Sequence, residues 1–142
     1  MALIGKLHPL LVHFPIALVM AAAAAELAAI ATPRHAWHTV AVANLRAGAA
    51  IGAVTAVTGW VLAGSASVDA TSALEWHRWV GMAGAVGALG AALLSSYRHV
   101  PSRRSVFVYR VALFGAAFLV AITGHLGGTL VWGAEFFRPS FQ

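Results

Sequence analysis

The chain has 142 residues, of which 61% are hydrophobic and only 9% are charged, and its mean hydropathy is +0.83. A water-soluble domain carries about 25% charged residues, so this composition excludes an ordinary soluble protein and makes lipid the main solvent. The nine Lys and Arg residues give a net charge of +5. Because they are spread over apolar segments, they indicate membrane topology and no nucleic-acid partner. The absence of cysteine excludes disulfides, thiolate-bound clusters and haem attached through a C-x-x-C-H motif.

Four apolar segments of the chain are long enough to cross a bilayer, which requires about 20 residues. We therefore predict an all-α fold in which residues 1–142 form a single domain, a four-transmembrane-helix up-and-down bundle. The predicted spans cover residues 7–31, 39–64, 74–97 and 106–132.

Two local signals refine these helices. Pro15 lies one turn inside the first span, and because proline lacks an N–H it should bend the helix just after His13. Ser72 and Glu75 have the S-x-x-E spacing of a capping box, which predicts the start of the third span.

An even number of spans places both termini on one side of the membrane. The basic residues divide three against six between that side and the other: Lys6, Arg78 and Arg138 against Arg34, Arg46, Arg98, Arg103, Arg104 and Arg110. Since cytoplasmic loops are enriched in Lys and Arg, the second group should face the cytoplasm. We thus predict a multi-pass protein of the bacterial inner membrane with both termini on the outer, periplasmic side.

Folding the chain up and down gathers four histidines from three spans near the outer side: His8, His13, His77 and His125. Ionisable residues inside a bilayer are costly and usually mark cofactors or transport pathways. A rise of about 1.5 Å per residue places His13 about 8 Å deeper than His8 and at a depth similar to that of His125. His8 and His13 are about 140° apart around a helix, so they cannot easily share one small ion.

The histidines suit three interpretations. In the first, two imidazoles from different helices bind the iron of haem b, with His13 as the preferred ligand and His125, by depth, or His77 as its partner. In the second, the four histidines bind copper or zinc directly. In the third, the protein is a structural subunit whose histidines and tryptophans anchor it to lipid or to a larger membrane complex. For haem, small residues would make room for the porphyrin and nearby side chains would meet its propionates: Gly59, Gly124, Gly127 and Gly128, with His8, Lys6 and Arg78.

Glu26 is a carboxylate in the inner half of the first predicted span. Arg46, on the second span, falls at a similar depth, and Arg110 on the fourth span is a second possible partner. We interpret Glu26 and Arg46 as a structural ion pair that fixes the register of the helices, with a proton path as the alternative.

Three motifs resemble those of the DUF2231 family of bacterial four-helix membrane proteins, over essentially the whole chain. They are H-P-L-L-V-H-F-P-I-A-L from His8, W-H-R-W-V-G from Trp76, and G-H-L-G-G-T-L-V from Gly124. The resemblance implies a membrane redox setting, because related domains occur beside c-type cytochrome domains. We therefore predict a haem-binding electron carrier near the periplasmic face, or a subunit of a respiratory or photosynthetic complex, rather than a stand-alone enzyme. Its expected partners are membrane lipid and a c-type cytochrome or other complex subunits.

Overall fold

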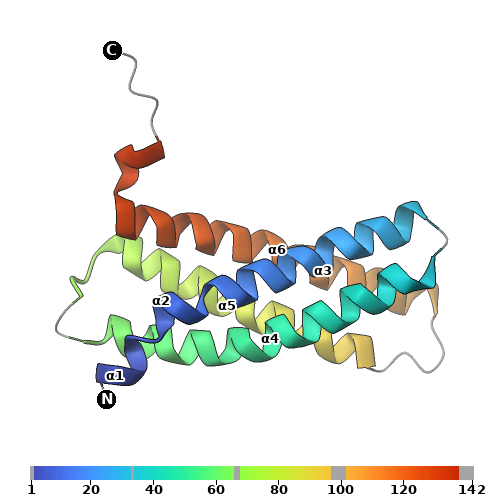
Figure 1. The fold of residues 1–142 in the computed structure, drawn as a ribbon, viewed down its shortest axis with the longest axis horizontal. Helices are drawn as coiled ribbons and strands as arrows, with labels where there is room; N and C mark the ends of the chain where they lie inside the picture. Colours follow the sequence, from blue (N-terminus) through green and yellow to red (C-terminus); the bar gives the residue numbers. More distant parts are fainter. Residues whose placement is uncertain (1, 33, 66–67, 97–101, 138–142) are drawn as a thin grey trace, which may run out of the picture.

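The computed structural model describes residues 2–32, 34–65, 68–96 and 102–137, and every regular element in these ranges is helical. Four long helices make up most of this part: α3 (His13–Ala31), α4 (His35–Ala63), α5 (Ser72–Ser96) and α6 (Arg103–Trp132). Two short helices precede them, α1 (Ala2–Gly5) and α2 (His8–Leu11), and a 3₁₀ turn, η1 (Ala134–Phe137), follows. Figure 1 shows the long helices side by side and alternating in direction, with α1 and η1 at the same end of the bundle.

The prediction of four membrane-spanning helices is confirmed, because all four helical segments are long and apolar enough to cross a bilayer. All four spans begin earlier than predicted, and the second and third end one residue earlier in the described part of the chain. They begin at Leu3, His35, Ser72 and Arg103. The fourth starts there because the Ser102 hydroxyl accepts a hydrogen bond from the Ser105 N–H (3.1 Å), which caps the helix.

The four helices pack as a ring. The interfaces between α3 and α4 and between α5 and α6 are the largest, and α4 with α5 and α3 with α6 close the ring. As a result, α3 and α5 lie diagonally opposite each other. The interfaces are built largely from small residues, and at Gly48 a Cβ atom would come within 3.0 Å of the Val19 side chain. This close approach is how helices associate in lipid, where no hydrophobic force drives them together.

The first span is interrupted where proline predicted a bend. Helix α2 ends at Leu11 and α3 begins at His13, so the break falls at Val12, just before His13 rather than just after it. Pro15 has no N–H to donate to the carbonyl of Leu11, four residues earlier, so this helical bond is missing, whereas Val12 N–H still donates to the carbonyl of His8 and Ile16 N–H to that of Val12. His8 therefore lies on the short stretch of the first span that precedes the break.

The start of α5 is capped by a residue other than the predicted one. The Thr71 hydroxyl accepts a hydrogen bond from the Leu74 N–H (3.2 Å), and the Thr71 carbonyl accepts one from the Glu75 N–H (3.1 Å). Thr71 is thus the N-cap and Ser72 is the first helical residue. The assignment of Ser72 and Glu75 as a capping box is therefore wrong by one position.

Candidate functional site

Two groups of polar side chains lie inside the bundle, one toward each end. We call the end at which α2 precedes α3 and α5 begins the histidine end, because it holds His8 and His77. The opposite end, where α6 begins, is the arginine end, because it holds Glu26 with Arg110.

At the histidine end, two imidazoles meet across the bundle. His8 projects from α2 and His77 from α5, which belongs to the diagonally opposite span. Their ring centroids are 6.3 Å apart and their planes are nearly perpendicular, at 82°. Both side chains are half-buried. The fold therefore brings together two of the four predicted histidines, from two different helices.

Both imidazoles are held in the same way by the backbone of a neighbouring helix. His8 Nδ1 lies 3.0 Å from the carbonyl oxygen of Thr55, and His77 Nδ1 lies 3.1 Å from that of Thr123. A carbonyl oxygen can only accept, so each Nδ1 carries the proton that is donated. In a neutral imidazole this leaves Nε2 with its lone pair, which is the form in which histidine binds metals.

Two of the predicted glycines make room for these rings. A Cβ atom at Gly59 would lie 2.7 Å from Cε1 of His8, and one at Gly127 would lie 3.1 Å from Cε1 of His77. The other two lie elsewhere on α6: Gly124 faces Ile16 of α3 at 3.3 Å, and Gly128 is half-buried. Gly59 and Gly127 thus allow the imidazoles to enter between the helices.

Arg78 is held beside the histidine pair by aromatic side chains. Its Cζ atom lies 4.0 Å from the ring centroid of Trp60, and the Trp60 and Trp79 rings are in edge contact at 5.6 Å. Its Nε atom is buried and has no hydrogen-bond partner among the described residues. The guanidinium is therefore oriented by a cation–π contact and retains a donor for an anionic group.

The other two predicted histidines do not enter the core. The side chains of His13 and His125 are both exposed on the outside of the bundle. The reason is rotation around the helix, since each lies two residues, or about 200°, from an inward-facing residue, Pro15 on α3 and Gly127 on α6. Their matched depth therefore does not produce a buried pair.

At the arginine end, Glu26 is fully buried and both of its carboxylate oxygens are engaged. Oε1 accepts a hydrogen bond from Arg110 Nε at 2.8 Å, and Oε2 lies 2.7 Å from His38 Nδ1. The His38 ring in turn packs edge-on against Tyr109 at 5.6 Å. The charge of Glu26 is thus balanced by a cation on another helix.

The expected pairing of Glu26 with Arg46 is wrong, and Arg110, the second possible partner, takes its place. Arg46 is exposed, because it follows the buried Leu45 and points about 100° away from it. His38 was not among the residues singled out from the sequence, although its spacing of three residues from the buried Ala41 favours the same inward face.

Comparison with protein families identifies the chain. The model of a family described as "predicted membrane protein (DUF2231)" matches residues 6–136. The chain belongs to the DUF2231 family. No curated protein and no solved structure is significantly similar to it.

The three sequence motifs that indicated DUF2231 meet at the histidine end. His8 comes from the first motif and His77 from the second, and Gly127 of the third lies against the His77 ring. In this DUF2231 chain, the described residues contain no group of three His, Asp or Glu side chains arranged to hold a metal ion. The site therefore offers a pair of imidazole ligands and an adjacent arginine.

Proposed function

We propose that this membrane protein binds one b-type haem at the histidine end, with His8 and His77 as the two axial ligands, and that it carries electrons. The observation that carries the proposal is the His8–His77 pair. Two imidazoles that bond one metal ion from opposite sides, each at about 2 Å, have ring centroids about 6 Å apart, and the observed separation is 6.3 Å. Axial ligands from facing helices are how bundles hold haem.

The number of ligands favours haem over copper or zinc. A protein zinc site uses three or four side chains, and copper sites built on imidazole use a similar number. The part of the chain that the structure describes has no third His, Asp or Glu near enough to complete such a site. Haem iron needs only two protein ligands because the porphyrin supplies the other four.

The surrounding residues have definable roles in this proposal. The carbonyls of Thr55 and Thr123 orient the imidazoles and raise their basicity as ligands. Arg78 fits a propionate, because its buried Nε lacks a partner in the described region. When bound, haem supplies one-electron redox chemistry, and the protein contributes ligands, orientation and electrostatics.

We also propose that the histidine end faces the periplasm of a bacterial inner membrane. The support is the distribution of the basic residues, since five of those described are at the arginine end and two at the histidine end: Arg34, Arg46, Arg103, Arg104 and Arg110 against Lys6 and Arg78. Two others used in the sequence argument, Arg98 and Arg138, lie outside the described residues. A redox partner such as a c-type cytochrome, or another subunit of a membrane complex, would then exchange electrons at the outer surface.

The test is a reduced-minus-oxidised absorption spectrum of the protein purified after expression with sufficient haem, with quantitative haem and metal analysis. Loss of even a second-shell partner costs about 10- to 100-fold in metal affinity, so His8→Ala and His77→Ala should each lower haem affinity at least that much. His13→Ala and His125→Ala are the matched controls, because their side chains are exposed, and they should leave the spectrum unchanged.

Three results would contradict the proposal. Absence of Soret absorbance in the wild-type protein would exclude haem. Stoichiometric copper or zinc without iron would favour the metal-site alternative. Loss of haem in His13→Ala and His125→Ala, but not in His8→Ala and His77→Ala, would show that His13 and His125 are the haem ligands.

A further inference from the structure

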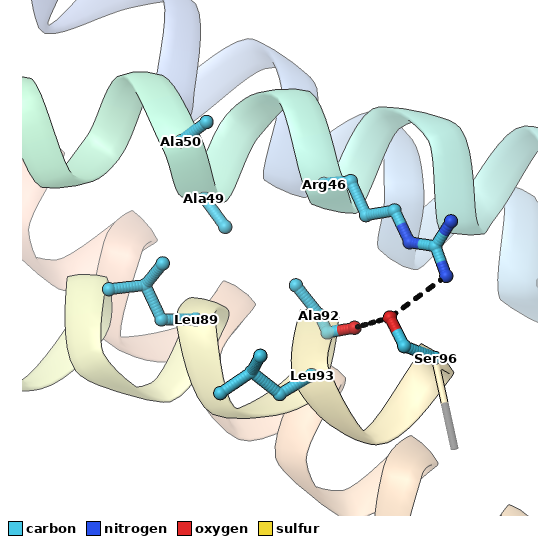
Figure 2. A pocket seen from close by; sticks show the side chains of 7 residues that line it. All are labelled: Arg46, Ala49, Ala50, Leu89, Ala92, Leu93 and Ser96. Carbon is cyan, nitrogen blue, oxygen red and sulfur yellow. Dashed lines mark hydrogen bonds between the residues drawn. The ribbon is translucent and has the colours of Figure 1, made fainter.

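An open groove runs between α4 and α5 at the arginine end. Its volume is about 210 Å³, several times that of one water molecule at about 30 Å³. Its walls are apolar and come from two helices: Ala49, Ala50, Leu89, Ala92 and Leu93. Figure 2 shows these side chains, with Arg46 extending from α4 toward Ser96 of α5. In a membrane, an apolar groove on the outside of the bundle is in contact with acyl chains.

The guanidinium of Arg46 closes the end of this groove that lies nearest the membrane surface. Its Nη2 donates to the hydroxyl of Ser96 (3.1 Å) and its Nε to that of Ser95 (3.3 Å). Ser96 is the last described residue of α5, so the side chain of Arg46 extends from α4 toward the arginine end of the bundle. The long side chain therefore carries its charge toward the interface while its stem lies along the apolar wall, as snorkelling arginines do.

None of the acidic side chains, all of which lie in the described ranges, balances this charge. The chain has only four acidic residues. Glu26 is bound by Arg110 and His38, and the others, Asp69, Glu75 and Glu135, lie at the histidine end. Arg46 donates to the neutral hydroxyls of Ser95 and Ser96. Its remaining guanidinium N–H groups have no partner among the described residues.

We propose that this groove is a binding site for an anionic phospholipid, with its phosphate bound by Arg46 and one acyl chain lying against Ala50, Leu89 and Leu93. The apolar wall matches the acyl chain, and the unbalanced guanidinium at the end of the groove matches the phosphate, which arginine binds with paired N–H donors. Anionic lipid is also attracted to the arginine end as a whole. The site is separate from the histidine pair and does not depend on haem.

The experiment is a lipid titration of the purified protein followed by native mass spectrometry, with phosphatidylglycerol compared with phosphatidylcholine of the same acyl chains. The wild-type protein should retain phosphatidylglycerol in preference. One arginine near the surface contributes about fivefold to such binding, so Arg46→Gln should lower phosphatidylglycerol retention by about fivefold and leave phosphatidylcholine unchanged. Arg46→Lys keeps the charge and should retain most of the preference.

Two further variants separate the groove from general surface charge. Arg104→Gln removes an equal charge from the same end, at an exposed position on the first turn of α6, and should lower retention clearly less than Arg46→Gln does, because Arg104 does not line the groove. Ala50→Leu keeps Arg46 but fills the groove from an exposed position, and should lower retention although the net charge is the same. If Arg46→Gln fails to fold, retention of phosphatidylglycerol by Ala50→Leu still tests whether the groove binds the lipid.

Several outcomes would overturn the proposal. Equal retention of the two lipids by the wild-type protein would exclude a site for anionic headgroups. An equal loss in Arg104→Gln and Arg46→Gln would assign the effect to the surface potential alone. Unchanged retention in folded Ala50→Leu would exclude the groove as the place where the acyl chain lies.

Discussion

The two ends of the bundle treat their buried polar side chains differently. At the arginine end, both oxygens of Glu26 are bound within the protein, by Arg110 and by His38. At the histidine end, His8 and His77 each bind a backbone carbonyl through one nitrogen only. The Glu26 group therefore has its charge and its hydrogen bonds satisfied within the protein. The histidine pair instead keeps two nitrogen lone pairs that face no described donor.

The contrast distinguishes structural from functional polar groups in a small membrane protein. An ion pair satisfied on both sides joins helices and fixes their register, and its value is lost when one partner is removed. Imidazoles that are oriented by second-shell carbonyls but keep an unused nitrogen are arranged to bind something further. We therefore expect substitutions at the arginine end to affect stability and those at the histidine end to affect the cofactor.

The largest effect is expected from Glu26→Gln. This change removes the buried carboxylate that Arg110, whose side chain is 35% exposed, is paired with. Breaking a fully buried pair costs about 3 to 5 kcal/mol in the free energy of unfolding, so the loss here should lie at the lower end of that range. Reversible unfolding in mixed micelles measures the loss. Glu75→Gln, at an exposed position of the histidine end, should change stability by less than about 0.5 kcal/mol. Equal losses of stability in the two variants would contradict a structural role of Glu26. Loss of the haem spectrum from folded Glu26→Gln would contradict it as well.

A smaller effect is expected from Gly59→Ala. The added Cβ atom would lie 2.7 Å from Cε1 of His8 and 2.8 Å from its Nδ1, and overpacking of this kind costs about 1 to 3 kcal/mol. The imidazole should be pushed away from the Thr55 carbonyl, so thermal stability and haem retention should fall together. Gly115→Ala is the matched control, because a Cβ atom there meets nothing within 4 Å. If Gly59→Ala retained haem as tightly as Gly115→Ala, His8 would not be a ligand.

The smallest effect is expected from removing the helix caps at the two ends. Thr71→Ala removes the cap of α5, and Ser102→Ala removes that of α6. Each should cost about 1 kcal/mol of stability. Only Thr71→Ala should also weaken haem retention, because α5 carries His77 in its second turn. Thermal melts recorded at the Soret band and by circular dichroism separate the two effects, and identical spectral losses would contradict the separation of the two ends.

The sequence predicted the four spans because hydropathy and length are sufficient to identify membrane helices. The sequence did not predict that His8 and His77 meet inside the bundle. The histidines were paired by their depth along the helix axis, whereas their direction around the helix determines which side chains point inward. On α5 the inward-facing residues are spaced by four and three from His77 onward: His77, Gly81, Gly84, Ala88, Ala91 and Ser95. This helical period assigns His77 to the core. On α6, His125 is twelve residues, or about 120°, away from the direction of the buried Leu113.

The partner of Glu26 illustrates what the sequence leaves open. Its own burial follows from a spacing of seven and four residues from the buried Val19 and Ala22. Arg46 and Arg110 lie at similar depths on different helices, so depth alone cannot choose between them. The choice depends on which neighbouring helix turns its arginine inward, and this is set by the packing of small residues around the whole ring.

The pairing of Glu26 also has a consequence for how the protein is made. His38 follows Glu26 by only 12 residues, whereas Arg110 follows by 84. A lone charged side chain at the centre of a span costs about 2.5 to 3.5 kcal/mol during insertion. We expect the hairpin of α3 and α4 to insert with His38 as the first partner of the carboxylate. The fourth helix then supplies Arg110 as the permanent counter-ion. The charge of Glu26 in the first span is therefore neutralised only after the last span has been synthesised.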